Sequence, residues 1–218
     1  MSLVAALRAM LPPGLALAGA DPRAAPDGLC PEERPATARM TSARLREYAA
    51  GRRAARAAMA ALGLSDAPIV MGRDRAPVWP EGVIGTISHD ATTCLALVGR
   101  ARDWDGLGLD LEPATPLPED VAALVCLPFE AADAGAARRV FCAKEAAYKA
   151  LYPRITTVLD FADMTVTLGP GPRFEARLAR AAGPFDAGTT FPGQIVEDAR
   201  QVAALVLLPR GAAPVAAL

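Results

Sequence analysis

The sequence predicts an α+β protein, and three observations lead to that class. A strongly helical segment occurs in each half of the chain, at about 39–62 and at 136–152. Short apolar runs of strand length accompany these segments, and turn-rich stretches separate the runs. The stretch 113–120, PATPLPED, contains three prolines and is the best boundary between the halves. The predicted domains are therefore residues 1–113 and 114–218.

The individual elements follow from local signals. At the amino terminus the sequence predicts a short helix and then a strand. In the basic helical segment Thr41 or Ser42 is the expected N-cap, and Gly63 is the expected stop. The other predicted elements are strands at 67–71, 83–88, 94–98 and 106–112, helices near 119–127 and at 136–152, and strands around 163–168, 173–180, 189–196 and 201–208.

Composition narrows the possible functions. The chain has 218 residues, is 52% hydrophobic and 22% charged, and carries a formal net charge of -1. These values are typical of one or two globular domains and argue against a disordered protein or a broad nucleic-acid binder. Only 5% of the residues are aromatic, so no platform for stacking bases is indicated. We therefore expect no nucleic acid among the partners.

The cysteine and terminal patterns indicate a cytoplasmic protein. The four cysteines are far apart and the chain has one histidine, so no structural zinc site is expected. Scattered cysteines suit a reducing compartment. The amino terminus lacks the basic start of a signal peptide, and Pro12 and Pro13 interrupt its apolar stretch. No segment reads as a membrane span, so no membrane partner is expected.

Two carboxylates share one face of the strand GLGLDLE. Because alternate residues of a strand share a face, the leucines point one way, and Asp110 and Glu112 point the other. The two carboxylates are roughly 6–7 Å apart by strand rise, so they repel each other unless a positive charge lies between them. A hard cation such as Mg²⁺ would meet this need. The alternative interpretation is the solvated edge of a half-buried strand.

A lysine lies on the apolar side of the helix RRVFCAKEAAYKALY. On a helical wheel Lys144 falls within the arc centred on Val140. Glu145 lies at the edge of that arc and Lys149 on the polar side. Because a bare ammonium in a core position is costly, Lys144 needs an anionic partner or a route to water. The alternative is a Glu145–Lys149 ion pair, with Lys144 extending to solvent.

The basic helix carries arginines on its apolar stripe. Arg52 and Arg56 fall on the stripe, and Arg44 borders it. A buried phosphate or carboxylate explains guanidiniums in such positions. An interdomain salt bridge would satisfy the same geometry.

The single histidine ends the apolar strand VIGTISHD. Ser88 and His89 point to opposite faces of a strand, so they cannot act together as nucleophile and base. They can instead offer a hydroxyl, a ring N–H and backbone N–H groups to an anion. A purely structural histidine is the alternative. Together with the carboxylates and arginines, this strand end indicates a metal-dependent enzyme for a phosphorylated small molecule, although no P-loop or G-x-G-x-x-G motif occurs.

Four motifs in order give the sequence a family resemblance. They are RLREYAAGRRAAR, APVWPEGVIGTISHD, GLGLDLEP and FCAKEAAYKAL, and they span residues 40–152. With them the sequence resembles the 4′-phosphopantetheinyl transferases, specifically the monomeric group that serves siderophore and polyketide carrier proteins. The resemblance implies a pseudo-dimer of two similar α/β subdomains with the active site in the cleft between them.

The resemblance also implies the reaction. The phosphopantetheine arm of coenzyme A would pass to a serine of an apo acyl or peptidyl carrier protein, with release of adenosine 3′,5′-bisphosphate. Asp110, Glu112 and Glu145 would bind Mg²⁺, with Asp110 and Glu145 coming from opposite sides of the cleft. Glu145, or Glu112 through a metal-bound water, would take the serine proton. The alternatives are a Mg²⁺-dependent phosphodiesterase, which releases its product to water, and a non-catalytic coenzyme A-binding module.

Coenzyme A contacts are implied at matching positions. Lys144 and the arginines would stabilise charge on the leaving group, and Lys149 would assist the leaving phosphate. Relatives often carry a basic residue where this chain has Met71, so Arg73 or Arg75 is expected to supply that charge. Asp90 stands where relatives often have cysteine, and its carboxylate should point outward. The expected contacts are Arg44, Arg52, Arg73, Arg75, Ser88, His89, Lys144 and Lys149.

Overall fold

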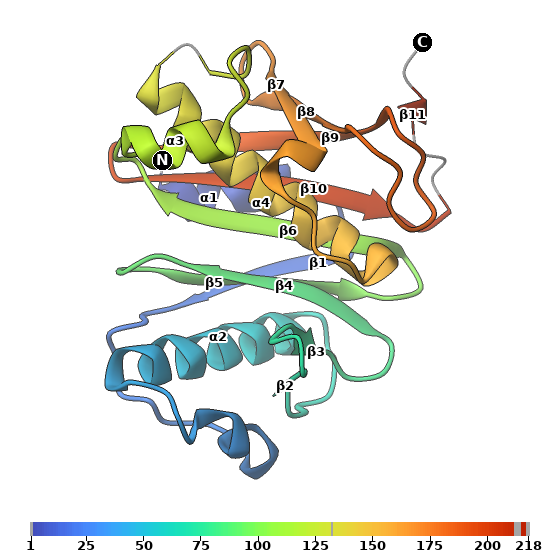
Figure 1. Cartoon of the computed structure of the whole chain (residues 1–218). Coiled ribbons are helices and arrows are strands. Elements are labelled where there is room, and N and C mark those ends of the chain that lie inside the picture. Colours follow the sequence, from blue (N-terminus) through green and yellow to red (C-terminus); the bar gives the residue numbers. More distant parts are fainter. Residues whose placement is uncertain (1, 132, 212–214, 217–218) are drawn as a thin grey trace. The chain divides into compact units, whose positions relative to one another are not determined.

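The chain forms two compact units of mixed helix and sheet (Figure 1). The computed structural model describes residues 2–131, 133–211 and 215–216. We call Met10–Asp103 the N-terminal unit, and Met1–Ala9 together with Trp104–Leu218 the C-terminal unit. The predicted α+β class is confirmed. The pseudo-dimer and its cleft stay predictions.

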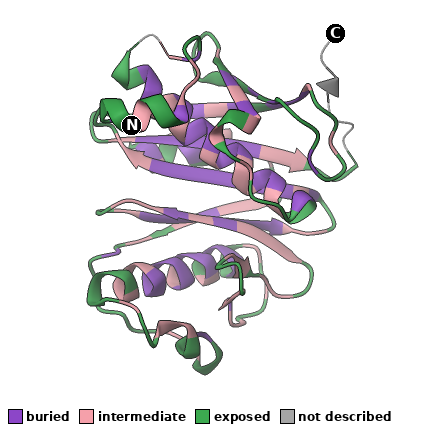
Figure 2. Cartoon of the chain, viewed as in Figure 1, coloured by how far each residue is buried: buried purple, intermediate pink, exposed green. Residues whose placement is uncertain are grey.

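The C-terminal unit is an antiparallel sheet with one long helix packed on it. The strands are hydrogen-bonded in the order β6-β10-β9-β8-β7, and β11 pairs with β9. Helix α4 packs against β6 and β10, and Figure 2 shows these elements as largely buried. The bounds are α1 Leu3–Met10, β6 Trp104–Pro113, α3 Glu119–Val125, α4 Ala134–Ile155, η2 Phe161–Asp163, β7 Met164–Leu168, β8 Arg173–Leu178, β9 Thr189–Glu197, β10 Gln201–Pro209 and β11 Val215–Ala216.

Helix α4 lies unusually close to β6, and two glycines of the GLGLD motif permit this approach. A Cβ atom at Gly108 would lie 1.8 Å from the carbonyl oxygen of Ala146, and one at Gly106 would lie 2.0 Å from that of Ala150. The helix presents small side chains to the strand at the same level. Residues 106, 108, 110 and 112 share one face of β6, so the motif carboxylates lie on the face that α4 covers.

The N-terminal unit packs the basic helix on a three-stranded antiparallel sheet of order β1-β5-β4. The Thr41 hydroxyl accepts from the backbone N–H of Arg44, which confirms this residue as the N-cap. Gly63 follows the helix with φ of +65°, as a helix stop requires. The bounds are β1 Leu15–Ala20, η1 Pro31–Thr37, α2 Ser42–Ala61, β2 Val70–Met71, β3 Pro77–Val78, β4 Val83–His89 and β5 Cys94–Arg100.

The division into units differs from the predicted one at 113/114. Strand β6 pairs with β10 along its length, so the D-x-E motif belongs to the same unit as the helix that carries Lys144 and Glu145. The proline-rich stretch follows this strand rather than separating two units. The strand predicted at 67–71 is also shorter than expected, at Val70–Met71. In the described part of the chain, no helix is long and apolar enough to cross a membrane.

Candidate active site

The three carboxylates predicted to bind a metal come from two packed elements of one unit. Asp110 and Glu112 lie on β6, and Glu145 lies on α4. The expectation that Asp110 and Glu145 come from opposite sides of an interdomain cleft is wrong, because α4 covers the face of β6 that carries Asp110. The solvated-edge interpretation is also wrong, since Asp110 is only 3% exposed.

Two cations neutralise the carboxylates of β6. The ammonium of Lys149 lies 2.6 Å from Oδ1 of Asp110, and a guanidinium nitrogen of Arg138 donates to Oε2 of Glu112 at 2.7 Å. Burial alone would lower the pKa of Lys149, but the charge of Asp110 and its hydrogen bond raise that pKa above the ordinary value. The alternative interpretation paired Lys149 with Glu145. In the structure Lys149 donates to Asp110 instead.

The carboxylates perturb one another. Burial, followed by the charge of Asp110, raises the pKa of Glu112 to about 7. The same two causes raise the pKa of Glu145, and Lys149 partly opposes them. Among the described residues, no three histidine, cysteine or acidic side chains are arranged so that they could hold a metal ion. The positive charge that the strand pattern calls for is supplied here by Lys149 and Arg138.

The raised pKa of Glu112 predicts how stability depends on pH. Because this pKa is higher in the folded state than in the unfolded chain, protonation stabilises the fold. That stability is complete below the unfolded pKa and is lost as pH rises through about 7. Metal-free Glu112→Gln should therefore exceed the wild type in free energy of unfolding at pH 8, by on the order of 1–2 kcal/mol.

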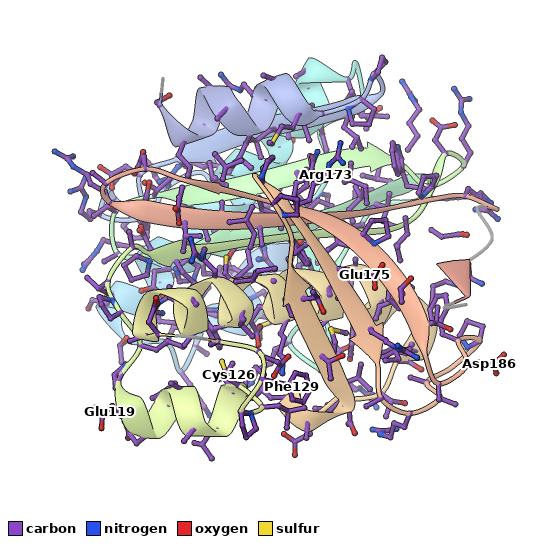
Figure 3. All side chains as sticks on the ribbon, turned by 90° about the horizontal axis from the view of Figure 1, so that it is seen from above. Glu119, Cys126, Phe129, Arg173, Glu175 and Asp186 are labelled. Carbon is purple, nitrogen blue, oxygen red and sulfur yellow. The ribbon has the colours of Figure 1, made fainter. Side chains whose placement is uncertain are left out.

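Thermal unfolding in the presence of a chelator, at a series of pH values, measures this difference. The gain should disappear as the pH falls below 4.5, where Glu112 is protonated in both the folded and the unfolded wild type. Exposed Glu119, at the outer start of α3 (Figure 3), provides the control variant Glu119→Gln. A Glu112→Gln protein that is less stable than the wild type at pH 8 would contradict the like-charge interpretation.

Lys144 has an anionic partner, as the helical wheel requires, but the partner is a protein carboxylate. Its ammonium donates to Oε2 of Glu130 at 2.8 Å, to the carbonyl oxygen of Val125 at 2.8 Å and to that of Phe161 at 2.9 Å. An ammonium has three N–H donors, and all three are used. The residue is 3% exposed, so the solvent-extended alternative is wrong. In this structure Lys144 therefore has no N–H group left to donate to a coenzyme A phosphate.

The exposed end of the N-terminal unit brings Arg44 and His89 together. A guanidinium nitrogen of Arg44 lies 3.0 Å from Nε2 of His89 and 3.1 Å from a carboxylate oxygen of Glu47. Arginine can only donate, so Nε2 accepts in this arrangement. Both predicted residues are reachable from solvent, and the Glu47 carboxylate beside them is an acceptor that sequence reasoning missed.

The two arginines on the apolar stripe of α2 have different partners. Arg56 pairs with the fully buried Glu33 at 2.7 Å. Its predicted anionic partner is therefore a carboxylate, and both residues belong to the N-terminal unit. Arg52 is 6% exposed, donates from Nε to the carbonyl oxygen of Ile69 and lies over the Tyr48 ring at 3.9 Å. Burial lowers the pKa of Arg52, and its buried Nη2 has no hydrogen-bond partner.

The remaining predicted contacts lie in turns and at a strand end. Arg73 and Arg75 are exposed in the turn between β2 and β3, where Arg75 has φ of +70°. Ser88 is buried near the end of β4. The Asp90 carboxylate accepts from the backbone N–H groups of Thr92 and Thr93, so it closes the turn between β4 and β5.

A pocket of about 200 Å³ lies beside Glu145 in the C-terminal unit. One wall belongs to α4, and the other to the segment that follows this helix and runs through η2. The lining combines the Glu145 carboxylate with mostly apolar side chains. Its residues are Lys144, Glu145, Tyr148, Val158, Leu159, Asp160, Phe161 and Met164.

The acidic and basic side chains and the pocket suit an enzyme that acts on a phosphorylated substrate. Comparison with known proteins identifies the family. The model of the 4′-phosphopantetheinyl transferase N-terminal domain matches residues 32–99, and that of the 4′-phosphopantetheinyl transferase superfamily matches residues 106–201. The chain belongs to the 4′-phosphopantetheinyl transferase superfamily. Membership implies an enzyme with coenzyme A as substrate and a carrier protein as partner.

Several curated proteins are similar to this chain. 4′-Phosphopantetheinyl transferase Svp of Streptomyces mobaraensis is 41% identical over 178 residues, which cover 77% of this chain and 68% of Svp. PptT of Mycobacterium tuberculosis is 39% identical over 152 residues, 65% of this chain and 67% of PptT. Enterobactin synthase component D of Salmonella typhimurium is 37% identical over 126 residues, about half of each chain.

Proposed function

We propose that this chain transfers the 4′-phosphopantetheine arm of coenzyme A to a serine hydroxyl of an apo acyl or peptidyl carrier protein. In this proposal the reaction depends on Mg²⁺ and releases adenosine 3′,5′-bisphosphate. The observation that carries it is the electrostatic coupling of three carboxylates in one unit: burial and the charge of Asp110 raise the pKa values of Glu112 and Glu145, and Glu145 also lines a pocket. A divalent cation relieves such repulsion.

In type, the three carboxylates fit magnesium, which prefers carboxylate oxygens, but they would have to move together to hold it, because no such group is arranged for a metal ion among the described residues. Asp110, Glu112 and Glu145 would hold the ion, which would neutralise charge on the pyrophosphate when bound. Lys149 and Arg138 already neutralise two of these carboxylates. The side chain of Lys149 is 28% exposed, and in this proposal its ammonium, which now bonds to Asp110, also pairs with a phosphate oxygen.

Proton removal from the serine falls to Glu145 or Glu112. A carboxyl group whose pKa lies near the working pH is the most effective general base, and the pKa of Glu112 is about 7. Glu145 lines the pocket itself and has a raised pKa as well. Both candidates therefore stay in the proposal.

The anionic end of coenzyme A would be bound by the basic side chains of the N-terminal unit. Arg44 and His89 offer exposed donors at one end of α2. The buried Nη2 of Arg52 supports an anion contact at this residue, because an unsatisfied guanidinium donor is costly. Arg73 and Arg75 are exposed and replace the basic residue expected at Met71.

The pocket beside Glu145 suits the arm itself. The pantetheine arm is an uncharged chain with amide groups, and the pocket offers an apolar lining next to the proposed base. An arm seated there would bring its phosphate end toward the carboxylates.

The wider setting is also part of the proposal. Relatives named enterobactin synthase component D favour a carrier protein of siderophore synthesis, and a polyketide or nonribosomal peptide carrier is the next choice. All four cysteines are free thiols, which supports a reducing, cytoplasmic location. We expect the chain to act as a monomer.

Mass spectrometry of candidate apo carrier proteins tests the proposal. After incubation with enzyme, coenzyme A and Mg²⁺, the carrier should gain the mass of the arm, and the gain should disappear with a chelator. A carrier whose acceptor serine is changed to alanine provides the control. Cleavage of coenzyme A with no protein acceptor would indicate the phosphodiesterase instead, and binding without cleavage would indicate a non-catalytic module.

A further inference from the structure

A buried ion pair joins the walls of the pocket. The carboxylate of Glu130 is fully buried and lies 2.8 Å from the ammonium of Lys144. The same carboxylate accepts from the backbone N–H of Leu127 at 2.6 Å and from that of Val166 at 2.6 Å. Glu130 belongs to the irregular segment between α3 and α4, which also contains the labelled residues Cys126 and Phe129 (Figure 3).

Besides α4 and the segment that carries Glu130, the contacts of this pair reach α3, η2 and β7. Lys144 adds bonds to the carbonyl oxygens of Val125, at the end of α3, and of Phe161, in η2. Glu130 adds its bond to β7 through Val166. The pair thus fastens the segment between α3 and α4 and the segment after α4 to helix α4 itself.

The segment after α4 forms one wall of the pocket, and part of it is exposed to solvent. Thr156 ends α4 in the left-handed region, and Val158, which lines the pocket, is 75% exposed. Phe161 lies farther along the same wall, and its carbonyl oxygen is held by Lys144. The residue next to Lys144 in the helix is Glu145, one of the two proposed bases.

We propose that Glu130 and Lys144 are positioning residues: they hold the wall formed by residues 158–164 against α4, and so set the shape of the pocket that receives the arm of coenzyme A. Lys144 acts on the substrate through this wall and not through a phosphate contact, because its three donors are already occupied. The inference deepens the proposed function and rests on it.

The two roles for Lys144 predict opposite effects of Glu130→Gln. If Lys144 were a phosphate ligand, removing its carboxylate partner would free the ammonium, and coenzyme A would bind more tightly. If the pair positions the wall, the same change weakens the pair, and coenzyme A binds less tightly. Glutamine keeps oxygen and nitrogen groups of the same size, although it loses the charge that strengthens the hydrogen bond to Lys144.

Calorimetric binding of two ligands separates the arm from the nucleotide. Coenzyme A has the arm, and adenosine 3′,5′-bisphosphate keeps the nucleotide and its phosphates but lacks the arm. Glu130→Gln and Lys144→Met should each weaken coenzyme A binding about tenfold or more, while the affinity for adenosine 3′,5′-bisphosphate stays within about twofold of the wild type. In the transfer assay KM for coenzyme A should rise more than kcat falls.

A double variant guards against loss of folding. Lys144→Met alone leaves a buried carboxylate without its cation, which is costly, whereas Lys144→Met with Glu130→Gln removes both charges. The double variant should regain thermal stability and still bind coenzyme A weakly, because methionine cannot hold the carbonyl oxygen of Phe161. The control is Arg139→Met with Glu197→Gln, an exposed ion pair of the same unit.

The outcomes are distinct from those of the proposed function. Transfer by the wild type to an apo carrier is established first, and its absence would overturn the proposed function alone. With transfer established, tighter coenzyme A binding by Glu130→Gln, equal losses for both ligands, or unchanged affinities in the folded double variant would each overturn the positioning role.

Discussion

Changing Asp110 to asparagine or Glu145 to glutamine is expected to lower the transfer rate by about 10³-fold or more, while the protein stays folded. Each change removes a negative charge from the proposed magnesium site but keeps nearly the same volume, so packing between β6 and α4 is preserved. Asp110→Asn also weakens the bond to Lys149, which lies 2.6 Å away, and so disturbs the proposed phosphate contact.

The measurement is carrier modification at saturating coenzyme A over a range of Mg²⁺ concentrations, together with circular dichroism of each variant. Glu119→Gln is the matched control, because it removes an exposed carboxylate from the same unit and should transfer at the wild-type rate. A variant at Asp110 or Glu145 that keeps a near wild-type rate would remove that residue from the metal site. Loss of rate that high Mg²⁺ restores would instead indicate weakened metal affinity.

Local signals predicted most elements of the fold. The cap at Thr41, the stop at Gly63 and the alternation in GLGLDLE each depend on neighbouring residues, and the structure has the corresponding helix and strand. The unit boundary could not be read in the same way. It depends on pairing between β6 and β10, whose paired residues are 88 to 105 positions apart, so the prolines after β6 gave the wrong position.

The partners of buried charges were the least predictable part of the site. Helical periodicity placed Lys144 and Arg56 on apolar faces, and both do need anions. Of their partners, Glu130 lies in the irregular segment between α3 and α4 and Glu33 in the short 3-10 helix η1, and helical or strand periodicity detects neither. The resemblance to the family offered a phosphate for Lys144, whereas the fold supplies a carboxylate. Arg138 was missed because its partner, Glu112, lies on another element.

Gly108→Ala is expected to have the second large effect, on stability and activity together. A Cβ atom at this position would lie 1.8 Å from the carbonyl oxygen of Ala146, in the backbone of α4. No side-chain rotation can relieve a clash with backbone, so the helix must move away from β6. We expect a loss of about 3 kcal/mol in the free energy of unfolding, the upper end of the usual cost of overpacking a core, because the clash is with backbone.

The same displacement of α4 should also lower the rate of transfer. Helix α4 carries Lys149 and Glu145, and strand β6 carries Asp110 two residues beyond Gly108, so separating the two elements lengthens the 2.6 Å contact between Lys149 and Asp110. A displacement of about 1 Å at a catalytic group can cost about 10²-fold in rate, and we expect a loss of that order in whatever fraction remains folded. The glycines of the motif thus serve the site by allowing the helix to approach the strand.

Thermal unfolding and the transfer rate of the folded fraction measure the two effects. The unfolding midpoint should fall by about 10 °C, from the usual relation between stability and midpoint in a chain of this size. Gly135→Ala is the control, because it lies in the first turn of the same helix and its Cβ would approach only the end of the Asp133 side chain, at 3.3 Å. If Gly108→Ala matched this control in midpoint and in rate, close packing of α4 on β6 would not be what assembles the carboxylates and Lys149.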